Sequence, residues 1–392
     1  MIDRTEVEFW REKMQSFVEK EMWPYEPLLP RFENTLPVKV TNNIIGKMKE
    51  QGLWSLTVPK KLGGQGLSTP LYCAVREALG RTVLWGITGI HLGGSGDPLM
   101  VLYHCNDEQK ERYLFPLMRG NLLVSFAQTE PGAGADQAGM KTRAVRKGSG
   151  WVLNGHKTLI TQGTVSDFVI VFASTDPEKG RKGVTCFLVD KGTPGFIIGD
   201  TIETMGGDRL GDLHFKDCYV PDSQVLGMVG DGFRMAQNWF IGNRITLQPP
   251  ICLGIVDRTI EELLRVFPKE VDDRWLGQIQ AEYQRARLLM YDAAYKFDQL
   301  EDPQYEASLS KVATVGLAMK VLRRALEISG SHGYAVDSMF QRYYRDVRRL
   351  PITEGSMETQ KMVTSRALIR GFSPVDSLSP NNGSEVGEYV SR

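Results

Sequence analysis

The hydrophobic pattern of this chain changes twice, and this change limits the possible fold more than any other feature. Apolar residues recur at helical spacing within 3–22, 38–52, 70–84 and 97–104. From about residue 121 the chain contains short runs rich in β-branched and aromatic residues, which are typical of strands. Helical spacing returns from Gly232 onward. We therefore expect an α+β protein in which the helices and the strands form separate domains.

The second helical region contains two long stretches, 276–297 and 304–329, that keep helical spacing, and Gly330 is expected to end the second. A chain of 392 residues is long enough for two or three domains. The expected domains are an N-terminal all-α domain (1–120), a small middle β-barrel or sandwich domain (121–228), a C-terminal four-helix-bundle domain (229–371) and a flexible tail (372–392).

Two local signals refine the expected β domain. Asn154 and Gly155 stand between two strand-like runs, and this dipeptide is a strong signal for a two-residue hairpin turn. In the segment LHFKDCYV, the alternation of Leu213, Phe215 and Tyr219 predicts a strand with one buried face.

Charge and cysteine content exclude several classes of protein. The chain has 47 basic and 47 acidic residues, so it has no net charge that would attract nucleic acid or an anionic membrane. Its 5 cysteines are scattered without a C-x-x-C pair, and its 5 histidines show no metal-binding spacing, so no metal site is expected. The N-terminus resembles neither a signal peptide nor a transit peptide, and no apolar run is long enough to span a membrane. A cytoplasmic protein is expected.

The stretch Arg345–Gln360, RDVRRLPITEGSMETQ, is the strongest candidate for a functional loop. Pro351 ends any preceding helix, and Ser356 can cap the next one. Between them Glu354 precedes Gly355, whose backbone can bend sharply. A carboxylate on a short loop between two helices is well placed to meet a ligand. Taken alone, the same pattern also fits an ordinary exposed acid before a helix.

A second stretch, FAQTEPGAGAD from Phe126 to Asp136, favours the functional interpretation. Together the two stretches resemble the signatures of the acyl-CoA dehydrogenase family of flavoproteins. NDEQKERYLFPLMRG before the second stretch, and WVLNGHKTLITQG and LHFKDCYVP after it, follow in the family's order, so the resemblance covers roughly 5–371. It implies the acyl-CoA dehydrogenase fold, FAD as cofactor, and α,β-dehydrogenation of an acyl thioester to a 2,3-enoyl thioester. Glu354 matches the base that removes the α-proton, and hydride passes from the β-carbon to FAD.

The resemblance also implies the residues that bind the ligands. Gly355, and Asn243 and Arg244 near the base, are assigned to the substrate. Asn243 occupies the position from which some members supply the base instead, and an amide cannot do so. The residues assigned to the cofactor are Phe126, Gln128, Thr129, Gly134, Ala135, Leu159, Thr161, Glu327, Gly330, Ser331, Ser356 and Glu358, with Glu327, Gly330 and Ser331 reaching the flavin of a partner subunit.

Several positions depart from the family pattern. Ala135 replaces a frequent Ser, and Leu159 stands where many members carry a Trp stacked on the flavin. Loss of that aromatic face gives up about 1 kcal/mol of stacking and opens space. The Arg-x-x-Phe-Gly motif, whose Arg reaches the cofactor pyrophosphate across subunits, is missing, and Arg265 and Arg274 are the candidates for the lost charge.

These departures keep two alternatives open beside the dehydrogenase: a flavin oxidase or monooxygenase on the same fold, and a non-catalytic thioester-binding relative. The partners implied are acyl-CoA or another acyl thioester, an electron acceptor such as electron-transfer flavoprotein, and further copies of the chain in a homodimer or homotetramer. The apolar width of the 276–329 helices agrees with such an assembly, although a monomeric bundle also fits it. The sequence does not distinguish acyl chain length, or CoA from a carrier protein.

Overall fold

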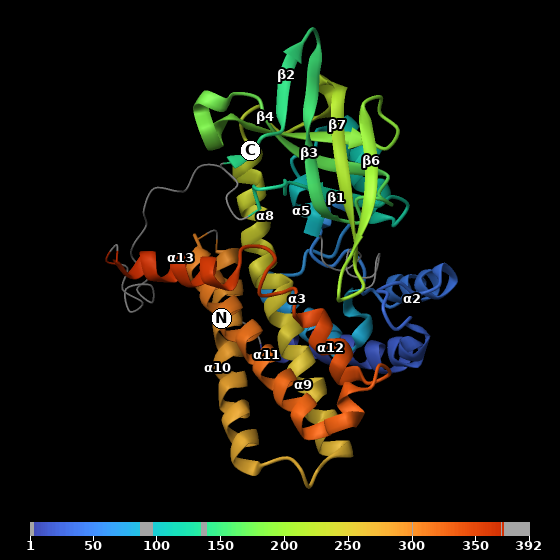
Figure 1. Cartoon of the computed structure of the whole chain (residues 1–392), viewed down its shortest axis with the longest axis vertical. Helices are drawn as coiled ribbons and strands as arrows, with labels where there is room; N and C mark the ends of the chain where they lie inside the picture. Colours follow the sequence, from blue (N-terminus) through green and yellow to red (C-terminus); the bar gives the residue numbers. More distant parts are fainter. Residues whose placement is uncertain (1–3, 87–96, 135–138, 300, 370, 372–392) are drawn as a thin grey trace.

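The computed structural model describes residues 4–86, 97–134, 139–299, 301–369 and 371. Along the chain, helices are followed by a β-sheet and then by helices again (Figure 1). This is the order that the hydrophobic pattern predicted, so the α+β fold class is confirmed.

The N-terminal part consists of helices joined by short 3₁₀ and π turns. Its central helix α3 is buried along its whole length and packs against α1 and, in the C-terminal part, against α9. The predicted helices all appear with somewhat different ends. They are α1 (Arg4–Phe17), continued by a π turn (Val18–Met22), α2 (Val38–Glu50), α3 (Thr69–Leu79), α5 (Asp97–Leu102), α6 (Asp107–Gln109) and α7 (Phe115–Met118).

The middle part is a largely antiparallel sheet whose strand order is β6-β7-β3-β2-β4-β5-β8, with β1 added in parallel to β4. Its two faces carry separate apolar clusters, one packed against neighbouring helices and the other formed within the sheet. The strands are β1 (Val124–Ala127), β2 (Arg143–Lys147), β3 (Gly150–Thr161), β4 (Phe168–Ser174), β5 (Val184–Asp190), β6 (Phe196–Glu203), β7 (Arg209–Pro221) and β8 (Val225–Leu226).

The predicted hairpin turn at Asn154 and Gly155 is wrong. Both residues lie inside β3, where the pairing with β7 shifts register between Leu153 and Gly155. A Cβ at Gly155 would lie 2.3 Å from Oγ1 of Thr142. The glycine therefore permits close packing within a bulged strand, whereas the β2–β3 turn is made at Gly148, which has φ +58°.

The predicted alternation along β7 is only partly correct. Leu213 and Phe215 are buried, but Tyr219 is exposed. Asp217 adopts φ +49° between them, which inserts an extra residue into the alternation and turns the following side chains to the opposite faces. Cys218 and Val220 are buried in place of Tyr219.

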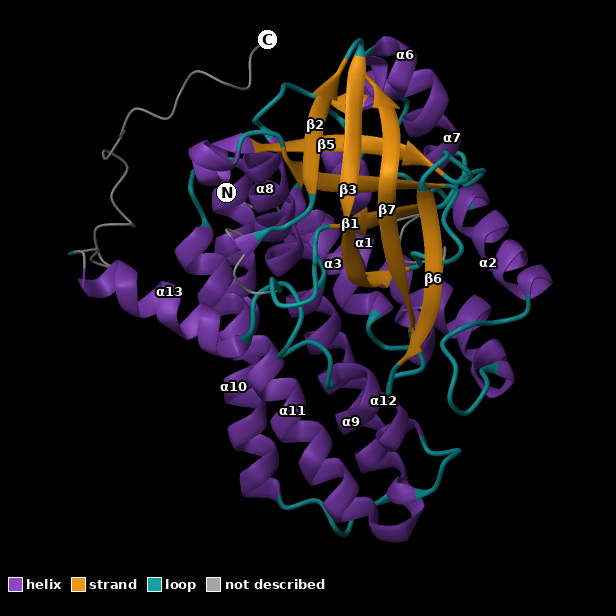
Figure 2. Cartoon of the chain, turned by 45° about the horizontal axis from the view of Figure 1, so that its top comes forward, coloured by secondary structure: helices purple, strands orange, loops and turns teal. Residues whose placement is uncertain are grey.

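The C-terminal part contains α8 (Gly232–Thr246), α9 (Gln248–Val266), α10 (Asp273–Asp298), α11 (Gln304–Tyr334), α12 (Met339–Val347) and α13 (Met357–Ile369). Helix α8 leads from the sheet into the bundle formed by α9, α10 and α11 (Figures 1 and 2). Gly330 ends the long continuous part of α11, as predicted, because its backbone is non-helical at φ +55° and ψ −133°. A separate short helical turn follows the kink and continues to Tyr334. In the described part of the chain, no helix has both the length and the apolar character needed to cross a bilayer.

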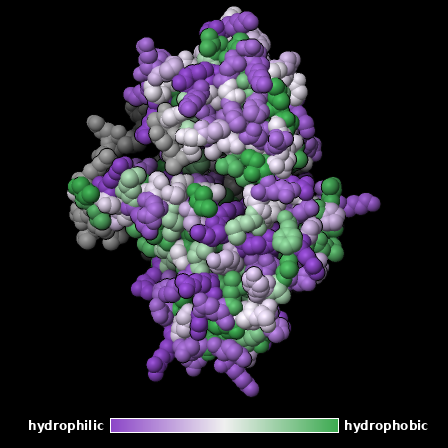
Figure 3. Space-filling model, viewed as in Figure 1, coloured by the Kyte–Doolittle hydropathy of each residue, from purple (hydrophilic) through white to green (hydrophobic). Residues whose placement is uncertain are grey.

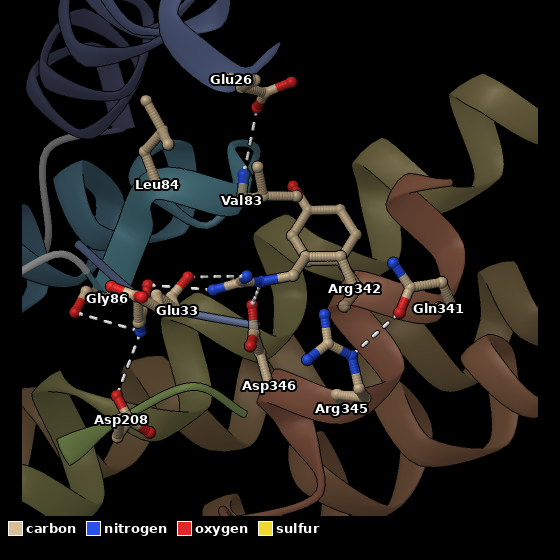
Figure 4. Close-up of polar contacts among 12 residues, drawn as sticks. Glu26, Glu33, Val83, Leu84, Gly86, Asp208, Gln341, Arg342, Arg345 and Asp346 are labelled. Carbon is tan, nitrogen blue, oxygen red and sulfur yellow. Dashed lines mark hydrogen bonds and ion pairs between the residues drawn. The ribbon is translucent and has the colours of Figure 1, made fainter. Parts of the chain in front are cut away.

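Arg342, which forms a buried ion pair within α12, also connects this helix to the N-terminal part and, through Asn34, to the sheet region (Figure 4). Nε of Arg342 lies 3.0 Å from Oδ2 of Asp346, and the same guanidinium donates to the carbonyl of Glu33 and to Oδ1 of Asn34. Asn34 in turn donates to Asp208, which follows β6. Burial raises the pKa of Asp346 to about 6, although Arg342 opposes this rise. The three parts of the chain thus meet next to the segment that leads to Glu354.

Candidate active site

The loop between α12 and α13 holds two consecutive residues in the left-handed region of the backbone. Glu354 has φ +55° and Gly355 has φ +85°. A Cβ on Gly355 would lie 2.4 Å from Nε2 of Gln360, so glycine is needed there for both conformation and space. A left-handed glutamate is uncommon, and such strain persists only where the surrounding contacts impose it. The backbone therefore fixes the direction in which the Glu354 carboxylate leaves the loop.

The contact that holds this loop comes from a buried lysine on α11. Nζ of Lys311 donates to the carbonyls of Thr353, at 2.5 Å, and Gly355, at 2.7 Å, on either side of Glu354. The Lys311 side chain is fully buried, and burial lowers its pKa to about 8, with Glu354 acting in the opposite direction. Sequence reasoning missed Lys311. The available signal was a lysine among the small and apolar residues of SLSKVATVG.

Helix α8 contacts the same loop from its other side. Nδ2 of Asn243 lies 3.4 Å from Oε1 of Glu354, and Nε of Arg244 donates to the Glu354 carbonyl at 2.9 Å. Burial lowers the pKa of Arg244, and the nearby Glu354 partly offsets this. An arginine remains charged at neutral pH even so. The structure therefore brings together Glu354, Gly355, Asn243 and Arg244, which the sequence assigned to catalysis and to the substrate.

The same helix connects this loop to the other sequence signature. Trp239 of α8 stacks on Phe126 of β1, with ring centroids 4.0 Å apart and an interplanar angle of 17°. Trp239 and Asn243 are four residues apart on α8, so their side chains lie on one face of the helix, about 6 Å apart along its axis. The stretch that begins at Phe126 therefore lies about one helical turn from the contact with Glu354.

A buried ion pair fixes the segment after Phe126. Nζ of Lys157 on β3 lies 2.7 Å from Oε1 of Glu130 and donates to the carbonyl of Gln128 at 3.1 Å. Glu130 also accepts hydrogen bonds from the backbone N–H groups of Lys141 and Thr142. Burial lowers the pKa of Lys157 to about 8, against the attraction of Glu130. Neither charge was singled out from the sequence, because only the fold shows that they are buried together.

The cofactor residues assigned to β3 lie beside this segment. The N–H of Thr158 donates to the carbonyl of Thr129, and the carbonyl of Thr161 accepts from Oγ of Ser125. Between them Leu159 adopts φ +57° and is 50% exposed, so it does not pack as an ordinary strand leucine in a core. The space around Gly134 is open, since a Cβ there would meet no atom within 4 Å. Ala135 lies outside the described residues.

This edge of the sheet fits a flat aromatic group with polar edges. Leu159 offers an exposed apolar surface beside Thr129 and Thr161. Among the buried side-chain atoms without a hydrogen-bond partner in the described structure are three near this edge: Oε1 of Gln128, Oε1 of Gln162 and Oγ of Ser166. Buried polar atoms are rarely left without partners, so these are available to a ligand. The residues present are therefore compatible with a flavin ring.

The remaining cofactor residues lie apart from this edge. Glu327 pairs with Arg323 and Arg324 near the far end of α11, about 24 Å along the helix from Lys311. Gly330 and Ser331 are still farther along the same helix.

Two others belong to the first turn of α13. Oγ of Ser356 accepts from the N–H of Thr359 at 3.2 Å and so caps the helix, as predicted. Glu358 is exposed and pairs with Lys361.

Family models account for almost the whole described chain. The N-terminal, middle and C-terminal domains of acyl-CoA dehydrogenase match residues 4–121, 125–218 and 230–369. An acyl-CoA dehydrogenase of Bacillus subtilis is 31% identical over 376 residues, which are 92% of this chain and 97% of that protein. The chain belongs to the acyl-CoA dehydrogenase family. The resemblance stated from the sequence is thus confirmed.

Other relatives agree with this assignment. A 3-(aryl)acrylate reductase of Clostridium sporogenes is 34% identical over 380 residues, covering 93% of this chain and 98% of that protein. The structure of butyryl-CoA dehydrogenase from Megasphaera elsdenii superposes with a TM-score of 0.82 at 27% identity, covering 94% of this chain and all of that one. This acyl-CoA dehydrogenase family member is an oxidoreductase with FAD as its cofactor, and it carries out acyl-CoA dehydrogenase-type chemistry, as predicted.

Proposed function

We propose that Glu354 is the base of this enzyme and removes the proton from the carbon next to the thioester carbonyl. The observation that supports this role is the loop geometry: a glutamate with φ +55° between two carbonyls that a buried lysine holds. A base must be held within reach of one proton, and this loop is held from both α8 and α11. The proton passes to the Glu354 carboxylate as the α-carbon–hydrogen bond breaks.

The neighbouring residues orient the carboxylate without competing for the proton. Asn243 donates to Oε1 of Glu354, and an amide does not accept a proton at neutral pH. Arg244 holds the Glu354 backbone and keeps its positive charge near the carboxylate. Bound FAD supplies one element of the chemistry, acceptance of the hydride from the β-carbon. The products are then a 2,3-enoyl thioester, a protonated Glu354 and reduced flavin.

Glu354→Gln tests this role, because the amide keeps the size of the side chain and the Gly355 turn. Loss of a positioned base lowers the rate by about 10²- to 10⁴-fold. We expect the rate of anaerobic flavin reduction by an acyl thioester to fall by about 10²-fold or more, while the FAD content is unchanged. Glu50→Gln, at the exposed end of α2 and with no role in either site, is the matched control and should reduce flavin normally.

The position of Asn243 offers a rescue experiment. Its Nδ2 lies 3.4 Å from the Glu354 carboxylate, so a carboxylate placed at 243 starts close to the original one. Asn243→Glu in the Glu354→Gln background should restore part of the lost rate. If Glu354→Gln alone reduced flavin at nearly the wild-type rate, Glu354 would not be the base.

A second candidate is the reverse direction, reduction of a 2,3-enoyl thioester. The relatives favour it, because they include the 3-(aryl)acrylate reductase and an acryloyl-CoA reductase (NADH) of Anaerotignum propionicum that is 32% identical. In that direction the protonated Glu354 returns its proton to the α-carbon. Mixing the photoreduced enzyme with an enoyl thioester measures this rate, and comparison with the forward rate shows which direction dominates.

We also propose two kinds of protein partner. Electron-transfer flavoprotein is the expected redox partner, which is supported by a 31% identical relative described as a subunit of the caffeyl-CoA reductase-Etf complex. A homodimer or homotetramer is expected through α10 and α11, where Leu288 is 69% exposed. Light scattering of the holoenzyme tests the assembly, and a monomer that retains FAD would contradict it.

A further inference from the structure

Two histidines and an aspartate meet on the outer face of the sheet, away from the loop of Glu354. His156 of β3 and His214 of β7 are directly opposite in the antiparallel register. Asp212 is two residues before His214, so its side chain lies on the same face. The two imidazole rings stack with centroids 4.2 Å apart. The cluster could not be predicted from residue spacing, because His156 and Asp212 are 56 residues apart.

The potential ligand atoms converge on one point. Nε2 of His156 lies 2.7 Å from Oδ1 of Asp212, and Nε2 of His214 lies 3.0 Å from Oδ2. One nitrogen or oxygen from each residue can be chosen so that all three lie within 4.8 Å of one another. Tetrahedral ligands about 2.1 Å from a zinc ion are about 3.4 Å apart, so small side-chain movements suffice.

The surroundings hold the Asp212 carboxylate in position. His156 lies 2.7 Å from its Oδ1, and the Thr158 side chain also hydrogen-bonds it. The Thr158 side chain thus fixes the carboxylate, as outer partners of metal ligands do. Position 199 on β6 has no side chain, and a Cβ there would lie 3.3 Å from Nε2 of His214. A larger residue at this position would therefore crowd the His214 ring.

We propose that His156, Asp212 and His214 form a binding site for a late first-row divalent metal ion such as Zn²⁺. Two imidazole nitrogens and one carboxylate oxygen are the ligand types that this ion prefers. Three protein ligands leave a fourth position for water, so the bound ion is exchangeable. Because the ligands come from two strands, the ion links β3 to β7. This site is independent of the role proposed for Glu354.

Equilibrium dialysis of the FAD-containing enzyme against ZnCl₂ tests the site. We expect the wild type to take up one Zn²⁺ per chain, and His214→Gln and Asp212→Asn to bind it at least tenfold more weakly. His332→Gln is the matched control, since this exposed histidine lies on α11, and it should bind as the wild type does. Circular dichroism and flavin content verify that each variant is folded.

A second measurement separates this site from metal bound elsewhere. Zn²⁺ at 100 times its Kd should raise the Tm of the wild type but not that of His214→Gln, because an ion that binds only the folded state stabilises it. Absence of saturable binding to the wild type would overturn the proposal. Equal binding and equal Tm shifts in the wild type, His214→Gln and Asp212→Asn would also overturn it.

Discussion

Replacement of Lys311 by methionine should slow flavin reduction, because the Glu354 loop is no longer held in place, while it changes the stability of the fold much less. The substitution keeps the length and apolar stem of the side chain but removes both hydrogen bonds to the loop, to Thr353 and Gly355. Hydrogen bonds from a charged group contribute about 1.5–3 kcal/mol each. Burial has the opposite effect, because the drop in the Lys311 pKa from 10.5 to about 8 corresponds to about 3 kcal/mol against the charged form, and Met carries no charge to bury.

These opposing contributions nearly cancel, so the free energy of unfolding should change by no more than about 3 kcal/mol. The rate of flavin reduction has no such compensation, because removal of the buried charge does not restore the position of Glu354. A base displaced by about 1 Å loses about 10²-fold in rate, and we expect a loss of this order in flavin reduction. Denaturant unfolding followed by circular dichroism gives the stability, and anaerobic stopped-flow mixing with an acyl thioester gives the rate.

Lys320→Met is the control, because Lys320 lies on the same helix but forms an exposed ion pair with Glu282. Lys320→Met should leave both the unfolding free energy and the rate of flavin reduction almost unchanged. Flavin reduction at the wild-type rate in Lys311→Met would show that the loop does not depend on this lysine. Destabilisation well beyond 3 kcal/mol would show that the balance of contributions is wrong.

Two further predictions concern the same region. The pKa of Asp346 is raised from 3.8 to about 6 in the folded state. Between pH 3.8 and pH 6, Asp346 is therefore protonated in the folded protein and ionised in the unfolded chain. Stability falls as the pH rises through this window. The difference in unfolding free energy between wild type and Asp346→Asn should therefore decrease by about 2 kcal/mol from pH 4 to pH 6. A flat difference in pH-dependent urea unfolding would contradict this. Gly355→Ala should lower flavin reduction by at least tenfold, because its Cβ would lie 2.4 Å from Nε2 of Gln360 at φ +85°. Gly46→Ala on α2, where a Cβ also meets nothing within 4 Å, is the control, and equal rates in the two variants would refute the argument.

The sequence predicted the features that depend on local patterns. The helices and their order follow from apolar periodicity, and the Ser356 cap follows from one side chain and the residues just after it. The hairpin prediction failed because Asn154 and Gly155 carry a strong local turn signal that tertiary packing overrides. Gly155 is required where Thr142 approaches β3, and the chain turns at Gly148 instead.

Features that depend on distant contacts could not be predicted. Lys311 is 42 residues from Thr353 along the chain, and nothing in its own helix shows that its ammonium group reaches the loop. The same holds for the pair of Lys157 and Glu130, whose burial only the sheet reveals. The resemblance to the family assigned Glu354 and Arg244 to one site, but their contact is visible only in the fold.

The central claim is that this chain removes two hydrogens across the α,β-bond of an acyl thioester, with Glu354 taking the proton. Anaerobic mixing of the FAD-containing enzyme with a panel of saturated acyl thioesters that vary in chain length, branching and carrier tests it most directly. At least one of them should bleach the flavin and yield one equivalent of the 2,3-enoyl thioester, and an α-deuterated form of it should react several-fold more slowly. If no saturated acyl thioester bleached the flavin while 2,3-enoyl thioesters failed to reoxidise the reduced enzyme, the claim would be contradicted.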